Sequence, residues 1–430
     1  MTTLEKAQQA VQAKTLLGTL DHNTKNKALG TIIKALQHNR QAIVAANQGD
    51  LERAEQEQLA APLLKRLKFD DQKIDETCEG LASLMKLADP VGSVMGAIEL
   101  DSGLELFKVS SPIGVIGVIF ESRPDALVQI ASLCLKSGNA VLLKGGREAA
   151  ATNLILADTI SRAAIQAGAP QGWLGLMETR SDVEALLGLS NQVDLIVPRG
   201  SNEFVQHIMR NTTIPVLGHA DGICHVYVDR HADMDMALRI SQDSKCQYVA
   251  VCNAAETLLV HEDAAEAFLP AMKAVFDANG VEMRGCERTT SIIDVTPASE
   301  EDWKTEYLDL IISIKIVDSL KTAIDHINQY GSGHTDVIVT NDKQRAVQFM
   351  DRVDSADVFV NCSSRFSDGF RFGLGAEVGI STNKIHTRGP VGLEGLMIYK
   401  WRLLGNGHIV ADYTGENAKP FTHRNLKLDG

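Results

Sequence analysis

One cysteine of the sequence occupies a position from which a nucleophile can reach a substrate. Cys252 falls between a predicted helix that ends near Gln247 and a predicted strand over Glu256–Val260, and Asn253 follows it. Loops at the edge of a sheet commonly carry catalytic residues, and a cysteine thiolate is a strong nucleophile. Position alone leaves two interpretations open, a catalytic thiol and a passive loop cysteine.

The other cysteines show no pattern of disulfides or metal ligands. The chain has seven cysteines, an odd number that argues against a disulfide framework and favours a reducing cytoplasm. Cys78 and Cys134 lie on apolar helical stripes, so both are predicted to fill the core. His219, Cys224 and His225 follow no ligand spacing, and we therefore predict no metal site.

A second chemical signal is a pair of glycines between a predicted strand and a predicted helix. Gly145 and Gly146 would let backbone amides approach an anion at the start of the helix, and Lys144 and Arg147 add positive charge. An ordinary strand–helix turn with solvated cations explains the same residues. The G-x-G-x-x-G, G-x-x-x-x-G-K-[ST] and H-E-x-x-H signatures are absent.

The composition excludes several classes of function. Lys and Arg number 42 against 55 Asp and Glu, which gives a net charge of −13 over 430 residues. Broad binding to nucleic acid needs a basic face, so no nucleic-acid partner is predicted. The longest strongly apolar stretch, Ile113–Phe120, is shorter than the ~18 residues of a membrane span. Met1–Ala10 shows no secretory signal, so no membrane partner is predicted either.

The elements that must position these residues alternate between strands and helices. Residues 1–90 follow helical periodicity, and residues 98–109 indicate a hairpin. Predicted strands then cover Ile113–Phe120, Ala140–Lys144, Val193–Val197, Val226–Val228, Glu256–Val260, Ser313–Val317, Val337–Val339 and Val358–Asn361. Predicted helices between them cover Ala126–Lys136, Glu148–Ala167, Asn202–Arg210, Met234–Lys245, Ala264–Ala278, Leu320–Tyr330 and Gln344–Arg352. This alternation predicts an α/β fold of parallel sheets, and its length predicts two domains with a boundary near Ile214–Gly222.

Several segments resemble the aldehyde dehydrogenase superfamily and, within it, the family of reductases that act on glutamyl phosphate. These segments are Pro112–Pro124, Ser137–Gly146, Leu195–Gly200, Gly222–Asp229, Cys252–Val260, Val360–Gly369, Phe372–Val378 and His386–Glu394. The resemblance implies an aldehyde-dehydrogenase-like fold with a Rossmann-like NADP-binding domain over residues 1–222, which includes a hairpin arm at about 96–112. Residues 223–385 are implied to form the catalytic α/β domain, and residues 386–430 a return segment and β-arm for oligomerisation. Cys252 and Asn253 match the family's catalytic Cys-Asn pair, so the resemblance assigns the nucleophile to Cys252.

The resemblance also implies which residues hold a nicotinamide cofactor. They are Lys144, Gly145, Gly146, Arg147, Pro198, Gly200 and, at the nicotinamide ribose, Glu306. NAD-preferring relatives often place an acidic residue three positions after the equivalent of Lys144, where this chain has Arg147. A guanidinium can pair with the 2′-phosphate of NADPH, so NADP(H) is the predicted cofactor.

A substrate with two anionic ends needs fixed cations in a net-acidic protein. The predicted substrate-binding residues are Arg123, Arg199, Arg365 and Arg388. A structural salt bridge is the alternative for Arg199, Arg365 and Arg388.

The resemblance further implies the reaction. The glutamate that activates water in hydrolytic aldehyde dehydrogenases falls on or near Gly218 in this chain. A glycine cannot take a proton from water, so we expect NADPH-dependent reduction of L-glutamyl 5-phosphate to L-glutamate 5-semialdehyde and phosphate through a Cys252 thioester. This is the second step of proline biosynthesis; a homo-oligomer is expected, and glutamate kinase is a candidate partner. The alternatives are a hydrolytic aldehyde dehydrogenase with another aldehyde substrate and a catalytically silent NADP-binding protein.

Overall fold

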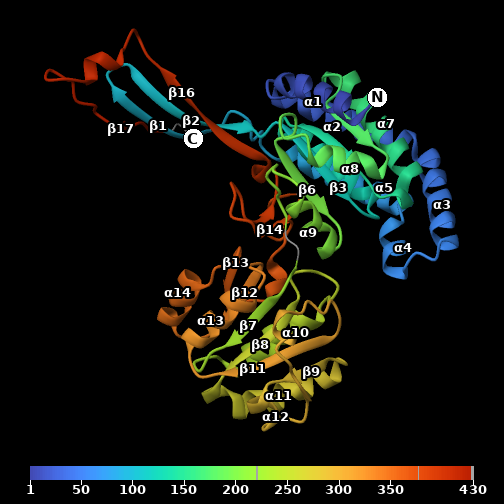
Figure 1. The fold of residues 1–430 in the computed structure, drawn as a ribbon, viewed down its shortest axis with the longest axis vertical. Coiled ribbons are helices and arrows are strands. Elements are labelled where there is room, and N and C mark those ends of the chain that lie inside the picture. The colour runs from blue at the N-terminus through green and yellow to red at the C-terminus, as the bar shows by residue number, and fades with distance from the viewer. Residues whose placement is uncertain (219–220, 376, 428–430) are drawn as a thin grey trace. The chain divides into compact units, whose positions relative to one another are not determined.

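A computed structural model describes residues 1–218, 221–375 and 377–427 and divides the chain into two compact units (Figure 1). The first unit comprises residues 1–200 and 208–216 together with the chain from Gly392 onward, and the second comprises residues 201–207 and 217–391. The chain from Gly392 onward groups with the first unit. The second unit takes in residues before the predicted boundary at 222. The functions assigned to the domains stay predictions.

The first unit contains a four-stranded parallel sheet covered by helices. Its strands are β3 (Val115–Phe120), β4 (Ala140–Lys144), β5 (Leu174–Met177) and β6 (Leu195–Arg199), in the order β5-β4-β3-β6. Its helices are α1 (Thr3–Leu17), α2 (His22–His38), α3 (Arg40–Gln56), α4 (Ala61–Leu67), α5 (Asp71–Lys86), α6 (Pro124–Lys136), α7 (Ala150–Ala167) and α8 (Arg180–Leu187); α9 (Asn202–Arg210) follows β6. The strand predicted over Ile113–Phe120 is confirmed as β3, which is buried along its whole length.

The first unit also carries an antiparallel arm. The predicted hairpin is confirmed as β1 (Val94–Asp101) and β2 (Leu104–Pro112), with Gly103 at φ +74° in its turn. Two strands from the end of the chain complete this sheet: β16 (Met397–Leu404) pairs along β2, and β17 (Arg424–Asn425) pairs with β1 (Figure 1).

The second unit is built on a seven-stranded sheet in which all the pairings are parallel. Its strands are β7 (Cys224–Val228), β8 (Ala255–His261), β9 (Glu282–Gly285), β10 (Thr296–Pro297), β11 (Ile311–Val317), β12 (Thr335–Val339) and β13 (Asp357–Val360), in the order β10-β9-β11-β8-β7-β12-β13. Its helices are α10 (Met234–Cys246), α11 (Glu262–Ala278), α12 (Glu287–Thr290), α13 (Leu320–Tyr330) and α14 (Lys343–Arg352), and β14 (Gly379–Ser381) pairs with β15 (Gly389–Val391). The short 3₁₀ helices of the two units are η1 (Arg147–Ala149), η2 (Asp302–Lys304), η3 (Ser364–Phe366), η4 (Glu394–Leu396) and η5 (Val410–Tyr413).

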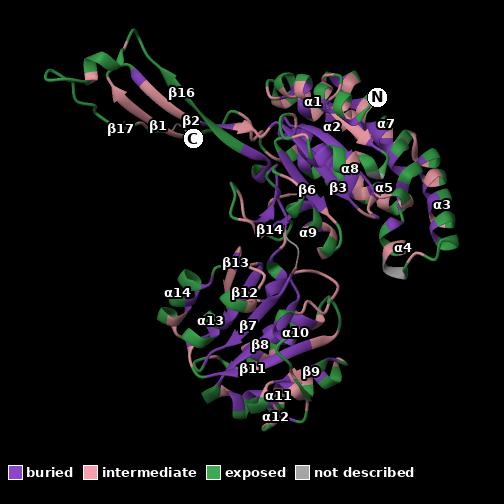
Figure 2. Ribbon diagram, in the orientation of Figure 1, coloured by how far each residue is buried: buried purple, intermediate pink, exposed green. Residues whose placement is uncertain are grey.

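Alternate residues of the central strands pack against helices on opposite faces of this sheet. Val226 and Val228 join a core with α10 and α11, whereas Tyr227 joins a second core with α13 and α14. Figure 2 shows the strands buried and the outer faces of these helices exposed. The second unit is therefore a three-layer α/β sandwich, as the alternating elements predicted.

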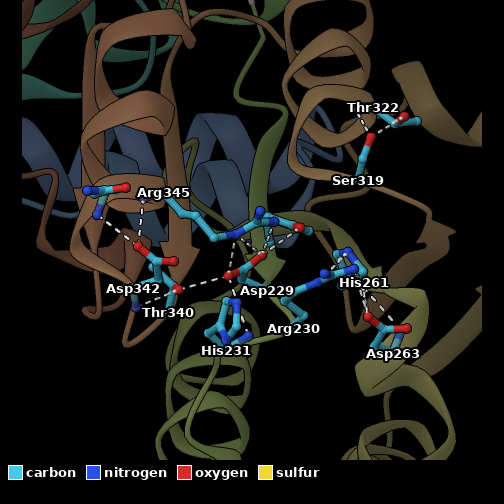
Figure 3. Close-up of polar contacts among 12 residues, drawn as sticks. Asp229, Arg230, His231, His261, Asp263, Ser319, Thr322, Thr340, Asp342 and Arg345 are labelled. Carbon is cyan, nitrogen blue, oxygen red and sulfur yellow. Dashed lines mark hydrogen bonds and ion pairs between the residues drawn. The ribbon is translucent and has the colours of Figure 1, made fainter.

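The carboxyl edge of this sheet is occupied by a buried ion pair at the point where the strand order reverses, between β7 and β12. The carboxylate of Asp229, directly after β7, accepts hydrogen bonds from Arg345 of α14: Nη2 donates to Oδ1 at 2.6 Å, and Nε donates to Oδ2 at 2.9 Å and to Oδ1 at 3.0 Å (Figure 3). Thr340 Oγ1, directly after β12, donates to Asp229 Oδ2 at 2.8 Å, and Tyr227 Oη donates to Oδ1 at 3.0 Å. Such a reversal point is the usual ligand crevice of a parallel sheet, but here protein side chains fill it.

This ion pair gives a stability prediction. Burial opposes the ionisation of Asp229, but hydrogen bonds from Arg345 and Thr340 and the charge of Arg345 lower its pKa below the usual value. Arg345→Met leaves a buried charge without its partner and should lower the free energy of unfolding at neutral pH by about 3–5 kcal/mol, measured by urea denaturation. The stabilisation by ionised Asp229 is fully present above the unfolded-state pKa of an aspartate, about 3.9, and is lost as pH falls through the lower pKa of Asp229 in the folded state. The difference in unfolding free energy between Arg345→Met and wild type should therefore become smaller in acid. Lys321→Met, which removes an exposed ion pair with Asp325, is the control and should leave the midpoint unchanged.

Candidate active site

Three segments that precede neighbouring strands meet at the amino edge of the sheet in the second unit. Gly222 precedes β7, Cys252 precedes β8 and His334 precedes β12, and these strands are adjacent in the order β8-β7-β12. Because the strands are parallel, their starts share one edge, opposite the edge that Asp229 and Arg345 fill. Residues far apart in the sequence are thereby brought into contact.

Gly222 lies directly against the backbone of Cys252. A Cβ atom at position 222 would lie 2.1 Å from the carbonyl oxygen of Cys252 and 2.4 Å from its Cα. Both contacts involve backbone atoms, so no side-chain rotation could relieve them. The absence of a side chain at position 222 is what allows the cysteine loop to occupy this place.

The thiol of Cys252 is half-buried and has an imidazole as its neighbour. Its Sγ lies 3.1 Å from Nε2 of the fully buried His334. The thiol of Cys224 donates to the carbonyl oxygen of Cys252 at 3.1 Å, which fixes the backbone of the loop. Burial raises the pKa of Cys224 and of Cys362, so neither is suited to act as a nucleophile. Within the described part of the chain, no carboxylate bonds to the sulfur of Cys252.

Asn253 anchors the other side of the cysteine loop. Its Nδ2 donates to the carbonyl oxygen of Ser367 at 2.7 Å, and its own carbonyl oxygen accepts from Ser364 Oγ at 2.6 Å. Its Oδ1 is buried without a hydrogen-bond partner. The side chain therefore ties the loop to the segment around η3 and leaves one amide oxygen unsatisfied.

Arg365 places a positive charge near the sulfur. The side chain is buried, its Nε donates to Gln247 Oε1 at 3.0 Å, and it interacts electrostatically with Cys252. Burial lowers the pKa of Arg365, which indicates a cation with little solvent around it. A guanidinium in this position can bind an anionic substrate group.

The other predicted arginines differ in their surroundings. Arg388 bonds to Asp354, with Nη1–Oδ1 at 3.1 Å and Nη2 to the backbone oxygen at 3.0 Å, which favours a structural salt bridge. Arg123 and Arg199 belong to the first unit, at the start of α6 and at the end of β6. Their contact with substrate stays a prediction.

Glu306 lies next to the glycine that supports the cysteine loop. Its Oε1 accepts from the backbone N–H of Gly222 at 2.9 Å, and its Oε2 accepts from Asn202 Nδ2 at 2.7 Å. Glu306, the carboxylate predicted to hold the nicotinamide ribose, therefore lies at the same edge of the sheet as Cys252.

A second carboxylate near this edge is already paired. Glu256 is fully buried in β8, its Oε2 lies 2.6 Å from Nζ of the equally buried Lys245, and its Oε1 accepts from Leu308 N at 3.3 Å. Burial raises the pKa of Glu256 to about 7 despite the charge of Lys245. This pair holds the start of β8 and the segment after Glu306 together.

In the first unit, the predicted cofactor residues gather at the carboxyl edge of the parallel sheet. Lys144 ends β4, and its Nζ donates to the oxygen of Gly145; burial lowers its pKa. A Cβ at Gly145 would lie 2.1 Å from Asn153 Nδ2, and one at Gly146 would lie 1.9 Å from Glu148 Oε1. The bare backbone, followed by η1, provides the close approach and the cation that a dinucleotide phosphate needs, so these residues fit a nicotinamide cofactor.

The remaining cofactor candidates lie at the same edge. Pro198 is buried near the end of β6, and Gly200 is exposed just beyond it. The side chain of Arg147 is 83% exposed and bonds to Glu57 Oε2 at 2.9 Å. An exposed pair of this kind is cheap to break, so the guanidinium is available to a ligand.

The sequence pattern did not reveal the contact of His334 with Cys252, the close contact of Gly222 or the Lys245–Glu256 pair. The sequence does contain a signal for Gly222 and His334, because both lie just before predicted strands, as Cys252 does. Among the residues that the structure describes, no group of three or more His, Cys, Asp or Glu could hold a metal ion; His219 lies outside them. No described helix combines the length and apolar character of a membrane span.

The second unit carries a half-buried cysteine at a sheet edge, and the first unit carries a glycine-rich edge of the dinucleotide-binding type. The model of the aldehyde dehydrogenase family matches residues 5–292 and 280–376 of the chain. The chain therefore belongs to the aldehyde dehydrogenase family.

Comparison with individual proteins narrows this class. The chain is 60% identical to the gamma-glutamyl phosphate reductase of Pelotomaculum thermopropionicum over 99% of this chain and 98% of that protein. It is 58% identical to the gamma-glutamyl phosphate reductase of Acetivibrio thermocellus over 99% of both chains. A crystal structure of gamma-glutamyl phosphate reductase from Thermotoga maritima, 41% identical, superposes with a TM-score of 0.93 and covers 95% of this chain and 100% of that chain. Within the aldehyde dehydrogenase family, the chain groups with the gamma-glutamyl phosphate reductases, and the predicted fold class is confirmed.

Proposed function

We propose that the chain reduces L-glutamyl 5-phosphate to L-glutamate 5-semialdehyde and phosphate, the gamma-glutamyl phosphate reductase step of proline biosynthesis, with NADPH as the reductant. The observation that carries the proposal is the half-buried sulfur of Cys252, with the buried cation Arg365 near it. Relatives at 58–60% identity are named for this activity.

In this mechanism the sulfur of Cys252 attacks the acyl carbon of the substrate. A C–S bond forms, the bond between that carbon and the phosphate oxygen breaks, and the glutamyl group is held as a thioester. Arg365 would stabilise the negative charge of the phosphate, and the backbone N–H of Cys252 would donate to the tetrahedral oxyanion. One such backbone donor is worth roughly 3–4 kcal/mol of transition-state stabilisation in other enzymes.

Residues from the first unit would bind the cofactor. A bound nicotinamide supplies the hydride that converts the thioester to the aldehyde. Lys144, Gly145, Gly146, Arg147, Pro198 and Gly200 are the proposed contacts to its phosphates and adenosine end. Glu306 would accept hydrogen bonds from the nicotinamide ribose.

Phosphate, and not water, is the proposed partner of the thioester. Gly218 offers no carboxylate to activate water, and the carboxylate of Glu256 is engaged by Lys245. The test is the reverse reaction: reduction of NADP⁺ by glutamate 5-semialdehyde, followed by the absorbance of the NADPH formed, with and without inorganic phosphate. We expect turnover only with phosphate. Equal turnover without phosphate would indicate a hydrolytic aldehyde dehydrogenase, and no turnover in either case a silent NADP-binding protein.

Arg147 provides a separate prediction on cofactor choice. Arg147→Glu places a negative charge where the 2′-phosphate is expected and should raise the KM for NADPH by roughly 10–100-fold, with little change for NADH. Arg162→Glu on α7, also an exposed arginine in an ion pair, is the charge-matched control and should change neither. Equal effects of Arg147→Glu on both cofactors would contradict the proposal.

The arm supports the proposal of a homo-oligomer. β16 lies at the edge of its sheet, and Trp401, Leu403 and Leu404 on it are 55–59% exposed. An unpaired edge with exposed large apolar side chains is suited to pairing with a second copy of the chain. Light scattering of the purified protein measures this directly. We further propose a cytoplasmic location and glutamate kinase as the source of the labile acyl phosphate.

A further inference from the structure

The imidazole of His334 is built into the site as part of a continuous hydrogen-bonded series. Its Nε2 lies 3.1 Å from Cys252 Sγ, and its Nδ1 lies 2.8 Å from Thr335 Oγ1. The Thr335 hydroxyl in turn bonds to the carboxyl of Asp357, its partner across the β12–β13 pairing. Both His334 and Thr335 are fully buried, and Asp357 is nearly so.

This series determines which nitrogen of His334 carries the proton. Burial raises the pKa of Asp357, while the hydrogen bond from Thr335 lowers it by stabilising the carboxylate. A threonine hydroxyl has one hydrogen, and because that hydrogen is donated to Asp357, Thr335 Oγ1 accepts from His334 Nδ1. Nδ1 is therefore the protonated nitrogen. The thiol hydrogen of Cys224, which lies 3.8 Å from Nδ1, is already donated to the carbonyl oxygen of Cys252. Nε2 is left with a lone pair directed at the sulfur of Cys252.

We propose that His334 is the base that takes the proton from the thiol of Cys252, and that Thr335 is a positioning residue that fixes the tautomer of His334. The inference deepens the proposed function, because it assigns the group that makes the nucleophile. The proton moves from Sγ to Nε2, the sulfur uses the freed electron pair to form the C–S bond, and phosphate leaves with the electron pair of the broken C–O bond. The departing phosphate takes up one proton, which returns His334 to its neutral form.

The groups that face this pair come from several elements. Cys224 contacts both residues from β7, Arg365 acts on Cys252 from η3, and Asp357 reaches His334 through Thr335 from β13. The positive charge of Arg365 favours the thiolate, and the carboxylate of Asp357 favours the imidazolium. Both therefore support transfer of the proton from sulfur to nitrogen.

The experiment measures alkylation of Cys252 by iodoacetamide in the full-length protein, without substrate, across pH. Labelling of each cysteine is read by mass spectrometry of the digested protein. Alkylation follows the thiolate fraction, so the wild-type rate should level off at lower pH than the rate of His334→Gln, with roughly a tenfold or greater difference in mildly acidic buffer. The kcat/KM of H334Q should fall by about 10²–10⁴-fold and recover in part as pH rises. Labelling of Cys286 in the same samples is the internal control and should not change.

A second variant keeps the proposal testable if H334Q does not fold. Thr335→Val keeps the shape of the side chain and removes the hydroxyl, so it should shift the alkylation profile of Cys252 in the same direction as H334Q, by less. Superimposable pH profiles of wild type and H334Q overturn the proposal even if turnover falls, because a merely structural histidine would not set the pH dependence. If H334Q does not fold, an unshifted T335V profile overturns it. Because labelling needs no substrate, a wild type without phosphate-dependent turnover contradicts the proposed function separately from this assignment.

Discussion

Replacing Cys252 with serine should reduce turnover of glutamate 5-semialdehyde, in the presence of phosphate and NADP⁺, by about 10⁴-fold or more. The substitution exchanges a thiolate for a hydroxyl that does not ionise at neutral pH, so no thioester can form. The residue is half-buried and the side chains have similar shape, so the fold should persist. Mass spectrometry should find a glutamyl adduct on the wild-type chain and none on Cys252→Ser.

Cys286→Ser is the matched control for this experiment. Cys286 is likewise a partly buried cysteine of the second unit, and its thiol contacts Thr289. The control should keep wild-type turnover. Retention of phosphate-dependent activity by Cys252→Ser would exclude the thioester mechanism.

Gly222→Ala should reduce kcat by about 100-fold or more without unfolding the protein. The added carbon would meet the backbone of Cys252 at 2.1–2.6 Å, so the cysteine loop must move. Misplacing a reacting atom by about 1 Å can cost 10²-fold in rate. The hydrogen bond from the backbone of Gly222 to Glu306 would be disturbed as well. Steady-state kinetics together with a thermal melt separate loss of rate from loss of fold.

Gly49→Ala provides the comparison. Gly49 lies within α3, and a Cβ there would meet nothing within 4 Å. Alanine in a helix is favoured over glycine by about 0.5–1 kcal/mol, so this variant should be slightly more stable and equally active. A wild-type kcat in Gly222→Ala would show that the cysteine loop tolerates the displacement. It would contradict the view that the close contact of Gly222 with Cys252 positions the nucleophile.

The buried parallel strands were predictable because their apolar runs are a local property of the sequence. β3, β4, β7, β8 and β12 all lie within or close to their predicted ranges. The resemblance implied a β-arm within residues 386–430, but the residue pattern was not used to assign the strand β16. Its sequence is MIYKWRLL, seven of its eight residues are exposed, and it pairs with β2, which lies far back in the chain. Apolar and basic residues alternate from Tyr399 to Leu403, a pattern that indicates a strand, but no local pattern identifies β2 as its partner.

Part of the candidate site was likewise predictable from the sequence, and part was not. The position of Cys252 before a predicted strand made it a candidate, and the resemblance assigned it as the nucleophile, whereas neither signal pointed to its neighbour His334. The contact depends on β8, β7 and β12 being adjacent, and strand order is not written in any short segment. Arg388 was predicted to bind an anionic substrate because it is an arginine. The structure shows instead that its guanidinium bonds to Asp354, a contact that the sequence cannot reveal.

The order of these strands has a consequence during synthesis of the chain. His334 follows Cys252 by 82 residues, so a ribosome-bound chain that has just released β8 has no imidazole beside its sulfur. Only after β12 has emerged and paired with β7 does the cysteine acquire the neighbour proposed to ionise it. Until then the nascent polypeptide carries an ordinary thiol, and oxidants or stray electrophiles would meet a poorer nucleophile than the one in the finished enzyme.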